Sequence, residues 1–228
     1  MRVLLVGHGR MGQLVETVAP EYGAVIVGVI TSRDAERALS EADARSIDVA
    51  IDFTLAEAVV RNLPILARRG VNVVIGTTGW GAHEKQMRET VAATGIGVLV
   101  AANFSLGMNI FQLVIEDAAR RFAKHPAFDA WIHERHHAAK KDAPSGTALQ
   151  LKAAMERAGY DRRIDMSSAR AGSIPGTHEV GFDGPSDTIT LTHAVRDRAV
   201  FARGALEAAR WLVGKHGWFT MRDLLAED

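Results

Sequence analysis

The stretch ERHHAAKKDAPSGTA at residues 134–148 places two histidines, two lysines and an aspartate directly ahead of a predicted helix start. Ser145 can cap that helix, and the free N–H groups of Gly146 and Thr147 can bind an anion such as a carboxylate. Gly146 has no side chain to block the approach of the anion. The segment therefore predicts a carboxylate-binding turn.

Charged and titratable side chains lie beside this turn in the sequence. His137 and Lys140 can add positive charge next to the same anion. His136 can serve as an acid or as a stabilising donor, because an imidazole titrates close to neutral pH. If such a carboxylate site faces a nicotinamide, it is the active site of a reductase.

Two alternative interpretations of the segment remain. Residues 133–137 read HERHH and match the H-E-x-x-H pattern of zinc proteases, which needs both outer histidines on one helical turn. Here the segment continues a strand-like run, and strand positions four apart lie about 13 Å apart, too far to share one ion. We therefore expect no metal site. The second alternative is a group of surface side chains, and their clustering before a helix cap argues against it.

A glycine-rich turn follows the first predicted strand, with the sequence Gly7-His8-Gly9-Arg10-Met11-Gly12. This is G-x-G-x-x-G between a strand and a helix, the setting that a dinucleotide site requires. Gly7 permits the tight turn, Gly9 lets a pyrophosphate approach the backbone, and Gly12 packs helix on strand. The helix N-terminus adds N–H donors and a positive dipole end. The alternative is a glycine turn that binds no ligand.

The second predicted strand ends in Ile30-Thr31-Ser32-Arg33-Asp34, without the acid that usually holds the ribose 2′-hydroxyl. A hydroxyl and an arginine, Ser32 and Arg33, suit a 2′-phosphate instead. We therefore expect NADPH or NADH as the cofactor, with NADPH favoured. Asp34 would reverse that order if the strand ran longer. The alternative is that Ser32 and Arg33 belong to a solvated loop.

Further loops follow later strands, at the sheet edge where a nucleotide lies in this architecture. Small residues there leave room for the ribose and the nicotinamide, and Thr77, Thr78 and Asn103 add polar side chains. We expect the cofactor to contact Phe53, Gly76, Thr77, Thr78, Ala101, Ala102, Asn103 and Phe104.

The whole chain has 228 residues, 47% of them hydrophobic and 24% charged, as in ordinary globular proteins. Lys+Arg and Asp+Glu are both 27, which argues against a broad nucleic-acid or membrane surface. The absence of cysteine excludes disulfides, thiol catalysis and cysteine metal sites. The run at 3–6 is too short for a signal peptide, and polar residues interrupt the apolar stretch at 95–115. We expect a cytoplasmic protein.

The hydrophobic pattern predicts the elements that position these residues. In the first hundred residues, β-branched runs alternate with amphipathic stretches, which indicates right-handed βαβ units and a parallel sheet. Buried strands are expected at Val3–Val6, Val25–Ile30, Val49–Phe53, Val71–Ile75 and Gly97–Ala101. Helices are expected between several of them, near Met11–Ala19, Ala56–Arg69 and Ala82–Ala93.

After about residue 103 the pattern changes. Helices are expected at 106–124, 147–158 and 202–215, and strands at 128–133, 179–182 and 188–195, the last two antiparallel. The predicted fold class is α/β, with a Rossmann-type parallel sheet domain and a second α+β domain that carries a mixed sheet. The strands around 178–195 have more alternating apolar positions than one helix layer can cover, so their spare face is expected to contact another subunit.

With these motifs identified, the sequence closely resembles the bacterial dihydrodipicolinate reductase (4-hydroxy-tetrahydrodipicolinate reductase) family. The most specific matching segment is ERHHAAKKDAPSGTA at 134–148. The other segments are GHGRMG at 7–12, DFT at 52–54, GTTG at 76–79, AANFSLGMN at 101–109, RAGSIPGTHEVGFDGPSDTITLTH at 170–193 and FARGALEAARWL at 201–212. The match spans nearly the whole chain.

The resemblance implies an enzyme of the diaminopimelate route to lysine, usually a homotetramer built by the sheets of its second domains. It implies hydride transfer from NADH or NADPH to C4 of a cyclic imine dicarboxylate, with loss of the 4-hydroxyl as water. It makes His136 and Lys140 the catalytic acid/base pair, because Lys140 rather than Lys141 has the family's spacing. Substrate carboxylates are implied at His137, Gly146 and Thr147, on the turn that Ser145 caps. Dinucleotide contacts are implied at 7–12, 32–33, 76–78 and 101–104.

Two departures from the family are visible. The second strand lacks the usual acid, which leaves the cofactor preference open, and the short segment at 33–48 is expected to lack a strand of longer members. We expect a dinucleotide-binding domain at 1–105 plus 206–228, to which the last helix returns. A substrate-binding and oligomerisation domain is expected at 106–205.

Two other functions are considered. Another Rossmann-type dehydrogenase, acting on an amino acid or a semialdehyde, would not need the block at 134–148. A nucleotide-binding regulator without turnover would not need His136 together with Lys140. The expected partners are a small dicarboxylate substrate and other copies of this chain, with no nucleic acid and no membrane.

Overall fold

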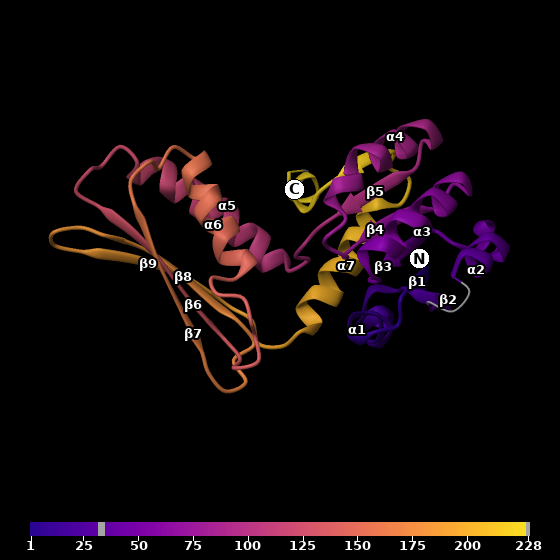
Figure 1. Ribbon diagram of the computed structural model, residues 1–228, viewed down its shortest axis with the longest axis horizontal. Helices are drawn as coiled ribbons and strands as arrows, with labels where there is room; N and C mark the ends of the chain where they lie inside the picture. Colours follow the sequence, from indigo (N-terminus) through magenta and orange to yellow (C-terminus); the bar gives the residue numbers. More distant parts are fainter. Residues whose placement is uncertain (32–34, 227–228) are drawn as a thin grey trace. The chain divides into compact units, whose positions relative to one another are not determined.

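The computed structural model describes residues 1–31 and 35–226 and divides into two compact units (Figure 1). The first unit comprises Met1–Leu106 with Ala199–Asp228, and the second comprises Gly107–Arg198. The predicted boundary at 205/206 falls inside helix α7 (Ala199–Leu212), whose buried alanines pack into the core of the first unit. Within the described residues, no helix combines the length and the apolar character needed to cross a membrane.

The first unit is a six-stranded parallel sheet in the order β10-β5-β4-β3-β1-β2, as the alternating pattern predicts. The strands are β1 (Arg2–Val6), β2 (Val25–Ile30), β3 (Val49–Asp52), β4 (Asn72–Ile75), β5 (Gly97–Val100) and β10 (Gly217–Phe219). The helices are α1 (Arg10–Val18), α2 (Ala35–Glu41), α3 (Ala56–Arg68), α4 (Glu84–Thr94), α7 and α8 (Met221–Leu225).

Helices cover both faces of this sheet. Val3 and Leu5 of β1 share one core with α1 and α7, while Leu4 and Val6 share another with α3 and α4. Because both faces are buried, the central strands are continuous apolar runs rather than alternating ones. Because all the strands are parallel, their carboxyl ends meet along one edge of the sheet.

Strand β2 differs from the expectation of a buried strand. It is an edge strand, and it exposes Val25, Val27 and Val29 at 61%, 41% and 40%. Among the described residues no strand lies beyond it, and α2 occupies part of the short segment at 33–48.

The chain returns to the first unit after residue 198, as expected for the last helix. Strand β10 and helix α8, which follow α7, were not predicted from the sequence. Strand β10 pairs with β5 in parallel and has only three residues, too few for a recognisable alternation.

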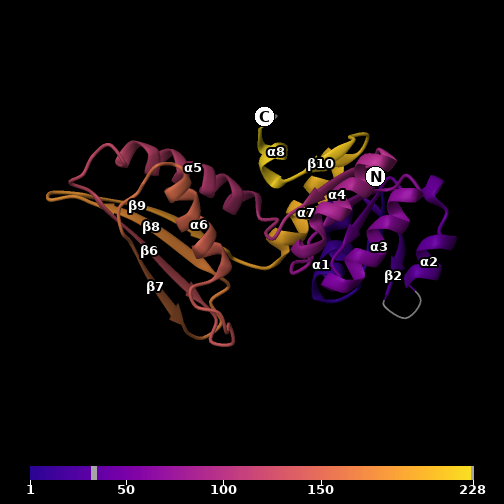
Figure 2. The same cartoon turned by 45° about the horizontal axis from the view of Figure 1, so that its top comes forward.

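The second unit is a four-stranded mixed sheet in the order β7-β6-β8-β9, covered on one face by α5 and α6 (Figures 1 and 2). Its elements are α5 (Leu106–Phe122), β6 (Asp129–His136), α6 (Gly146–Arg157), β7 (Ile164–Arg170), β8 (Thr177–Asp183) and β9 (Thr188–Ala194). Strand β7 was not predicted, and it pairs with β6 in parallel. Strand β6 runs three residues beyond its predicted end and so includes His136.

The face of this sheet opposite the helices is not apolar, contrary to the expectation. Inward-facing Val180 pairs with Leu191, so the alternate positions of β9, Thr188, Thr190 and Thr192, lie on the other face and are exposed. Trp131 of β6 covers Gly181 there, where a Cβ atom would lie 2.1 Å from the ring. The face is thus threonine-rich around one tryptophan.

Candidate active site

The glycine-rich turn between β1 and α1 has the geometry that a dinucleotide needs. Gly7 has φ of +92°, and a Cβ atom there would lie 2.7 Å from the carbonyl oxygen of Phe53. A Cβ atom at Gly12 would lie 2.3 Å from the carbonyl oxygen of Gly7, so glycine allows the close helix–strand packing. A Cβ atom at Gly9 would meet nothing within 4 Å, which leaves space at the start of α1 for a phosphate.

A cavity of about 920 Å³ opens beside this turn within the first unit. Of the predicted cofactor residues, Gly7, His8, Gly9 and Phe53 line it. Thr31 lines it where the usual acid would stand, and α3 contributes Arg61. The size and the convergence of strand ends fit a dinucleotide.

A buried carboxylate organises two of the loops at this edge. Asp52, at the end of β3, accepts hydrogen bonds from the backbone N–H and the hydroxyl of Thr54 and from Asn62. Thr77 of the next loop also reaches it, at 3.4 Å. Burial raises the pKa of Asp52, although these hydrogen bonds oppose the shift. Thr77 is therefore a structural link between loops in this structure.

The remaining predicted cofactor residues lie at varied depths. A Cβ atom at Gly76 would lie 1.9 Å from the ring of Phe53, so this glycine admits the ring. Phe104 is buried, and its carbonyl oxygen packs against Gly204 of α7. Met11 packs against the core, Thr78, Ala102 and Arg10 are exposed, and Ala101 and Asn103 are half-buried. Ser32 and Arg33 lie outside the described residues. Contact of all these residues with a cofactor stays a prediction.

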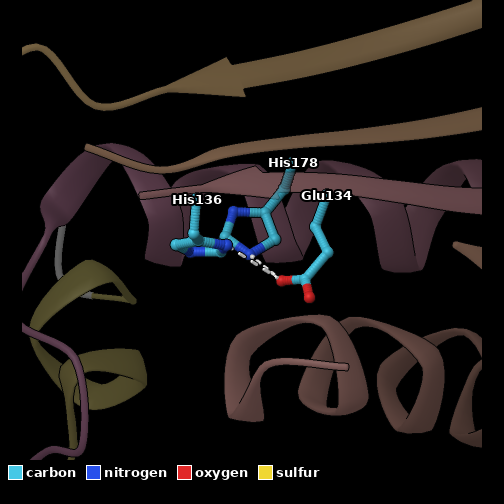
Figure 3. Close-up of side chains that lie close together, drawn as sticks. All are labelled: Glu134, His136 and His178. Carbon is cyan, nitrogen blue, oxygen red and sulfur yellow. Dashed lines mark ion pairs between the residues drawn. The ribbon is translucent and has the colours of Figure 1, made fainter. Parts of the chain in front are cut away.

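In the second unit, three titratable side chains meet on the helix-covered face of the sheet (Figure 3). His136 Nδ1 lies 3.2 Å and His178 Nε2 lies 3.6 Å from Glu134 Oε2, and both rings point toward that carboxylate. Glu134 and His136 are alternate residues of β6, and His178 pairs with Glu134 across β8. All three are buried, Glu134 to 1% exposure.

The carboxylate of Glu134 is extensively hydrogen-bonded. Its Oε1 accepts from the backbone N–H of Ser145 at 2.9 Å, from Ser168 Oγ at 2.8 Å and from Arg170 Nη2 at 2.7 Å. Burial alone would raise the pKa of Glu134, but the hydrogen bonds from Ser145, Arg170 and Ser168 outweigh it and lower the pKa to about 2. Glu134 is therefore ionised throughout the neutral range.

Burial lowers the pKa of both imidazoles. Burial, with a contribution from nearby His136, lowers the pKa of His178 to about 4. Burial also lowers the pKa of His136, and the charges of Lys140 and Arg170 add to the effect while that of Glu134 opposes it. The charge of Lys140 thus acts on His136, and the catalytic role of this pair stays a prediction.

The turn that is predicted to bind a carboxylate begins α6, and its binding role stays a prediction. Ser145 caps α6 by accepting the N–H of Ala148 on its hydroxyl, at 3.2 Å. The carboxylate of Asp142 accepts Lys140 Nζ at 2.8 and 2.9 Å and also the backbone N–H of Gly146. A Cβ atom at Gly146 would meet nothing within 4 Å. Lys140 and the start of α6 thus converge on one carboxylate.

The other predicted substrate residues lie at the same turn. His137 accepts the backbone N–H of Lys140 on its carbonyl oxygen, at 3.1 Å, and its side chain is half-buried. Thr147 is the second residue of α6 and is also half-buried. The adjacent Lys141 is exposed.

The zinc-protease pattern is not realised, because β6 is extended through this segment. His133 bonds Ser167 of β7 through Nδ1, on the face opposite Glu134. Glu134, His136 and His178 could ligate an ion, since their ligand atoms lie within 4.8 Å of one another. A cation there would meet the guanidinium of Arg170, 2.7 Å from Glu134 Oε1. We interpret the cluster as a hydrogen-bonded network, and the expected lack of a metal stays a prediction.

Sequence reasoning missed four members of this site: Glu134, Asp142, Arg170 and His178. Glu134 and Asp142 were visible inside the motif, but nothing in its spacing gave them a role. Arg170 and His178 reach the site only through the pairing of β7 and β8 with β6. The signal that could have found Glu134 and His136 together is their alternate placement on one strand.

Comparisons with known proteins agree over both units. Family models described as dihydrodipicolinate reductase, N-terminus and C-terminus, match residues 1–104 and 107–225. The 4-hydroxy-tetrahydrodipicolinate reductase of Stenotrophomonas maltophilia (strain R551-3) is 42% identical over 239 residues, covering 99% of this chain and 98% of that protein. The protein of the same name from Archaeoglobus fulgidus is 36% identical over 263 residues, with 99% and 100% covered.

Among solved structures, a dipicolinate-bound dihydrodipicolinate reductase from Paenisporosarcina sp. TG-14 has a TM-score of 0.81 and 22% identity, with 96% of this chain and 97% of that chain covered. It supports the two-unit fold, with a Rossmann-type sheet and a smaller mixed sheet. The family models and the full-length relatives extend the agreement to the sequence. The chain therefore belongs to the dihydrodipicolinate reductase family, the pyridine-nucleotide-dependent reductases of the diaminopimelate route to lysine.

Proposed function

We propose that this chain reduces 4-hydroxy-tetrahydrodipicolinate to tetrahydrodipicolinate and water, with NADPH or NADH as the reductant. The observation that carries the proposal is the convergence of Lys140 and the Gly146 N–H on the carboxylate of Asp142. The same donors, with His137 and Thr147 beside them, suit a substrate that carries carboxylates. The Paenisporosarcina relative, named as dipicolinate-bound, supports a planar dicarboxylate as the ligand class.

The proton chemistry is assigned to His136 and Lys140 as a pair. The leaving 4-hydroxyl must gain a proton to depart as water. The hydride from the cofactor supplies the electron pair for the new bond at C4. Lys140 brings an ammonium group, and His136 brings an imidazole whose Nδ1 faces Glu134. Positioned groups of this kind typically contribute about 10²–10⁴-fold to a rate.

The cofactor is assigned to the cavity of the first unit. The turn at 7–12 would hold its pyrophosphate against the N-terminus of α1, where Gly9 leaves room. Gly7, His8 and Phe53 would contact it along the cavity wall. When bound, the nicotinamide supplies the hydride for the reduction.

Assembly and location complete the proposal. The chain is proposed to form a homotetramer in the cytoplasm, with no nucleic-acid or membrane partner. Support for self-association comes from the open sheet face of the second unit, where Trp131 and the threonines of β9 are presented.

The test is an assay with the condensation product of pyruvate and aspartate semialdehyde. Mixed with NADPH and this protein, it should cause loss of the near-ultraviolet absorbance of NADPH, and the product should be tetrahydrodipicolinate. Amino acids with NADP⁺ serve as the control for an amino-acid dehydrogenase. Turnover of those alone, or nucleotide binding without any turnover, would contradict the proposal.

A further inference from the structure

Glu134 carries a charge in a buried position, yet the proposed reaction gives it no proton to transfer. We propose that Glu134 is a positioning residue, whose Oε1 fixes the turn that begins α6 and whose Oε2 orients the imidazole of His136. This inference rests on the proposed function of the same site and adds to it a residue that touches neither substrate nor cofactor.

The first half of the inference concerns the carboxylate-binding turn. The N–H of Ser145 donates to Glu134 Oε1, while the hydroxyl of Ser145 accepts the N–H of Ala148 as the cap of α6 and also lies 3.3 Å from His178 Nε2. Glu134 therefore anchors the residue directly before the Gly146–Thr147 pair to the centre of the sheet. Arg170 and Ser168 hold the same oxygen from β7, so the anchor is fixed from two elements. Without this carboxylate, the start of α6 is no longer held in place, and its free N–H groups can point in other directions.

The second half concerns the tautomer of His136. Its Nδ1 lies 3.2 Å from Glu134 Oε2, close enough for an ion pair but outside hydrogen-bond geometry, and within the described residues neither atom has a hydrogen-bond partner. An ionised carboxylate only accepts, so this contact favours the tautomer that carries the hydrogen on Nδ1 and leaves Nε2 with its lone pair. A Cβ atom at Gly176 would lie 3.2 Å from Nε2, so this glycine keeps space beside the nitrogen. Glu134 thereby directs Nε2 away from the network.

The charges around His136 make this role measurable. Lys140 and Asp142 face it from the loop after β6, Arg170 from β7 and His178 from β8, besides Glu134 on its own strand. Of these groups, Glu134 and Asp142 favour protonated His136, whereas Lys140 and Arg170 disfavour it. If His136 acts as an acid, activity falls as pH rises through its pKa. Removing the charge of Glu134 should move that alkaline limb to lower pH.

The matched experiment compares Glu134→Gln with Glu179→Gln. Glu179 lies on the opposite face of the same sheet, paired with Arg135 at 2.6 Å, so its variant makes the same charge change away from the site. For Glu134→Gln we expect a KM for the dicarboxylate raised at least about tenfold and an alkaline limb shifted down by about one pH unit. Glu179→Gln should change neither. A folded Glu134→Gln protein with the KM and pH profile of the wild type would overturn the inference.

A conservative variant separates the effect of the Glu134 charge from the effect of its side-chain length. Glu134→Asp keeps the charge and shortens the side chain by one methylene. It should restore most of the pH profile while the KM stays raised, because the hydrogen bond to Ser145 is lost or stretched. If Glu134→Asp shifts the pH profile as far as Glu134→Gln does, the carboxylate charge is not what acts on His136.

One measurement needs no variant and no turnover. ¹⁵N NMR of the histidine side chains in the wild-type protein should show neutral His136 with the hydrogen on Nδ1. The opposite tautomer would refute the orientation by Glu134, even if Glu134→Gln failed to fold. Absence of reductase activity in a wild type with the expected tautomer would instead refute the proposed function.

Discussion

Thr147 is the second residue of α6, where a hydroxyl can reach an anion held by the helix N-terminus. Thr147→Val should raise the KM for substrate more than it lowers kcat, because this contact binds ground state and transition state alike. Loss of one hydrogen bond to a charged group corresponds to about tenfold. Steady-state kinetics test this, with exposed Thr192→Val on β9 as the control.

The same site should bind a planar dicarboxylate without turning it over. Pyridine-2,6-dicarboxylate should compete with substrate in the wild type, and less well in Thr147→Val. A lack of competition at roughly millimolar concentration would count against carboxylate binding at α6.

The buried carboxylate of Glu134 makes stability depend on pH. Its folded pKa of about 2 lies below the ordinary 4.5, so the stabilisation is complete above 4.5 and is lost as pH falls toward 2. A shift of that size corresponds to roughly 3 kcal/mol. Urea unfolding of the wild type should therefore weaken more between pH 5 and pH 3 than that of Glu134→Gln. Parallel pH dependences would show that the carboxylate is not specifically stabilised.

The preference for NADPH over NADH is also expected to depend on single residues. Ser32 and Arg33 lie outside the described residues, and their types predict contacts with a 2′-phosphate. One charge-assisted hydrogen bond is worth roughly 1.5–3 kcal/mol, so NADPH should exceed NADH in kcat/KM by about tenfold. Arg33→Ala should remove most of this preference. Equal kcat/KM values of the wild type with NADPH and with NADH would contradict this prediction.

Residues of the site could be predicted where they are contiguous. His136, Lys140 and Ser145 stand in one motif whose order already implies a turn before a helix. His178 and Arg170 were beyond reach, because only strand pairing brings them to Glu134. Phe104 shows the opposite case: its place in a strand-end loop is visible in the sequence, but its burial against Gly204 is not.

At the scale of elements, Arg162 ties together the end of α5 and the start of β6. Its guanidinium donates to the carbonyl oxygens of Phe122, Ala123, His125 and Phe128 at 3.0 to 3.2 Å, and it lies over the ring of Tyr160. Phe122 is the last residue of α5, so the guanidinium lies at a helix C-terminus, where a cation is favourable.

Arg162→Ala should therefore lower the free energy of unfolding by about 2–4 kcal/mol, since several charge-assisted hydrogen bonds are lost together. Chemical denaturation measures this. Arg163→Ala is the matched control, because Arg163 is 86% exposed and pairs only with Asp165 among the described residues. Equal effects of the two substitutions would mean that the carbonyl contacts contribute little.

Elements could be predicted where apolar periodicity is strong. The central strands of the parallel sheet are continuous apolar runs and were found within one residue at most ends. Strand β7 reads IDMSSAR, with few apolar positions, and was missed. The predicted end of strand β6 came too early, because the last inward positions of this strand are Glu134 and His136. These polar residues stand where the pattern would need apolar ones.

At the scale of the whole molecule, the open face of the second sheet is where assembly is expected. Its threonines and Trp131 differ from the apolar face inferred from the sequence, so the interface would be flat and partly polar. Sedimentation should show a tetramer at micromolar concentration, and Thr190→Arg on that face should weaken it. A stable monomer of the wild type would remove the assembly prediction.

We propose that the block at 134–148 is the catalytic centre of a reductase. The most direct measurement compares kcat of Lys140→Ala with that of Lys141→Ala, adjacent lysines of which one pairs with Asp142 beside α6 and the other is exposed. We expect kcat to fall by about 10²–10⁴-fold in Lys140→Ala and to stay near the wild-type value in Lys141→Ala. Wild-type turnover by Lys140→Ala, or an equal loss in both variants, would contradict it.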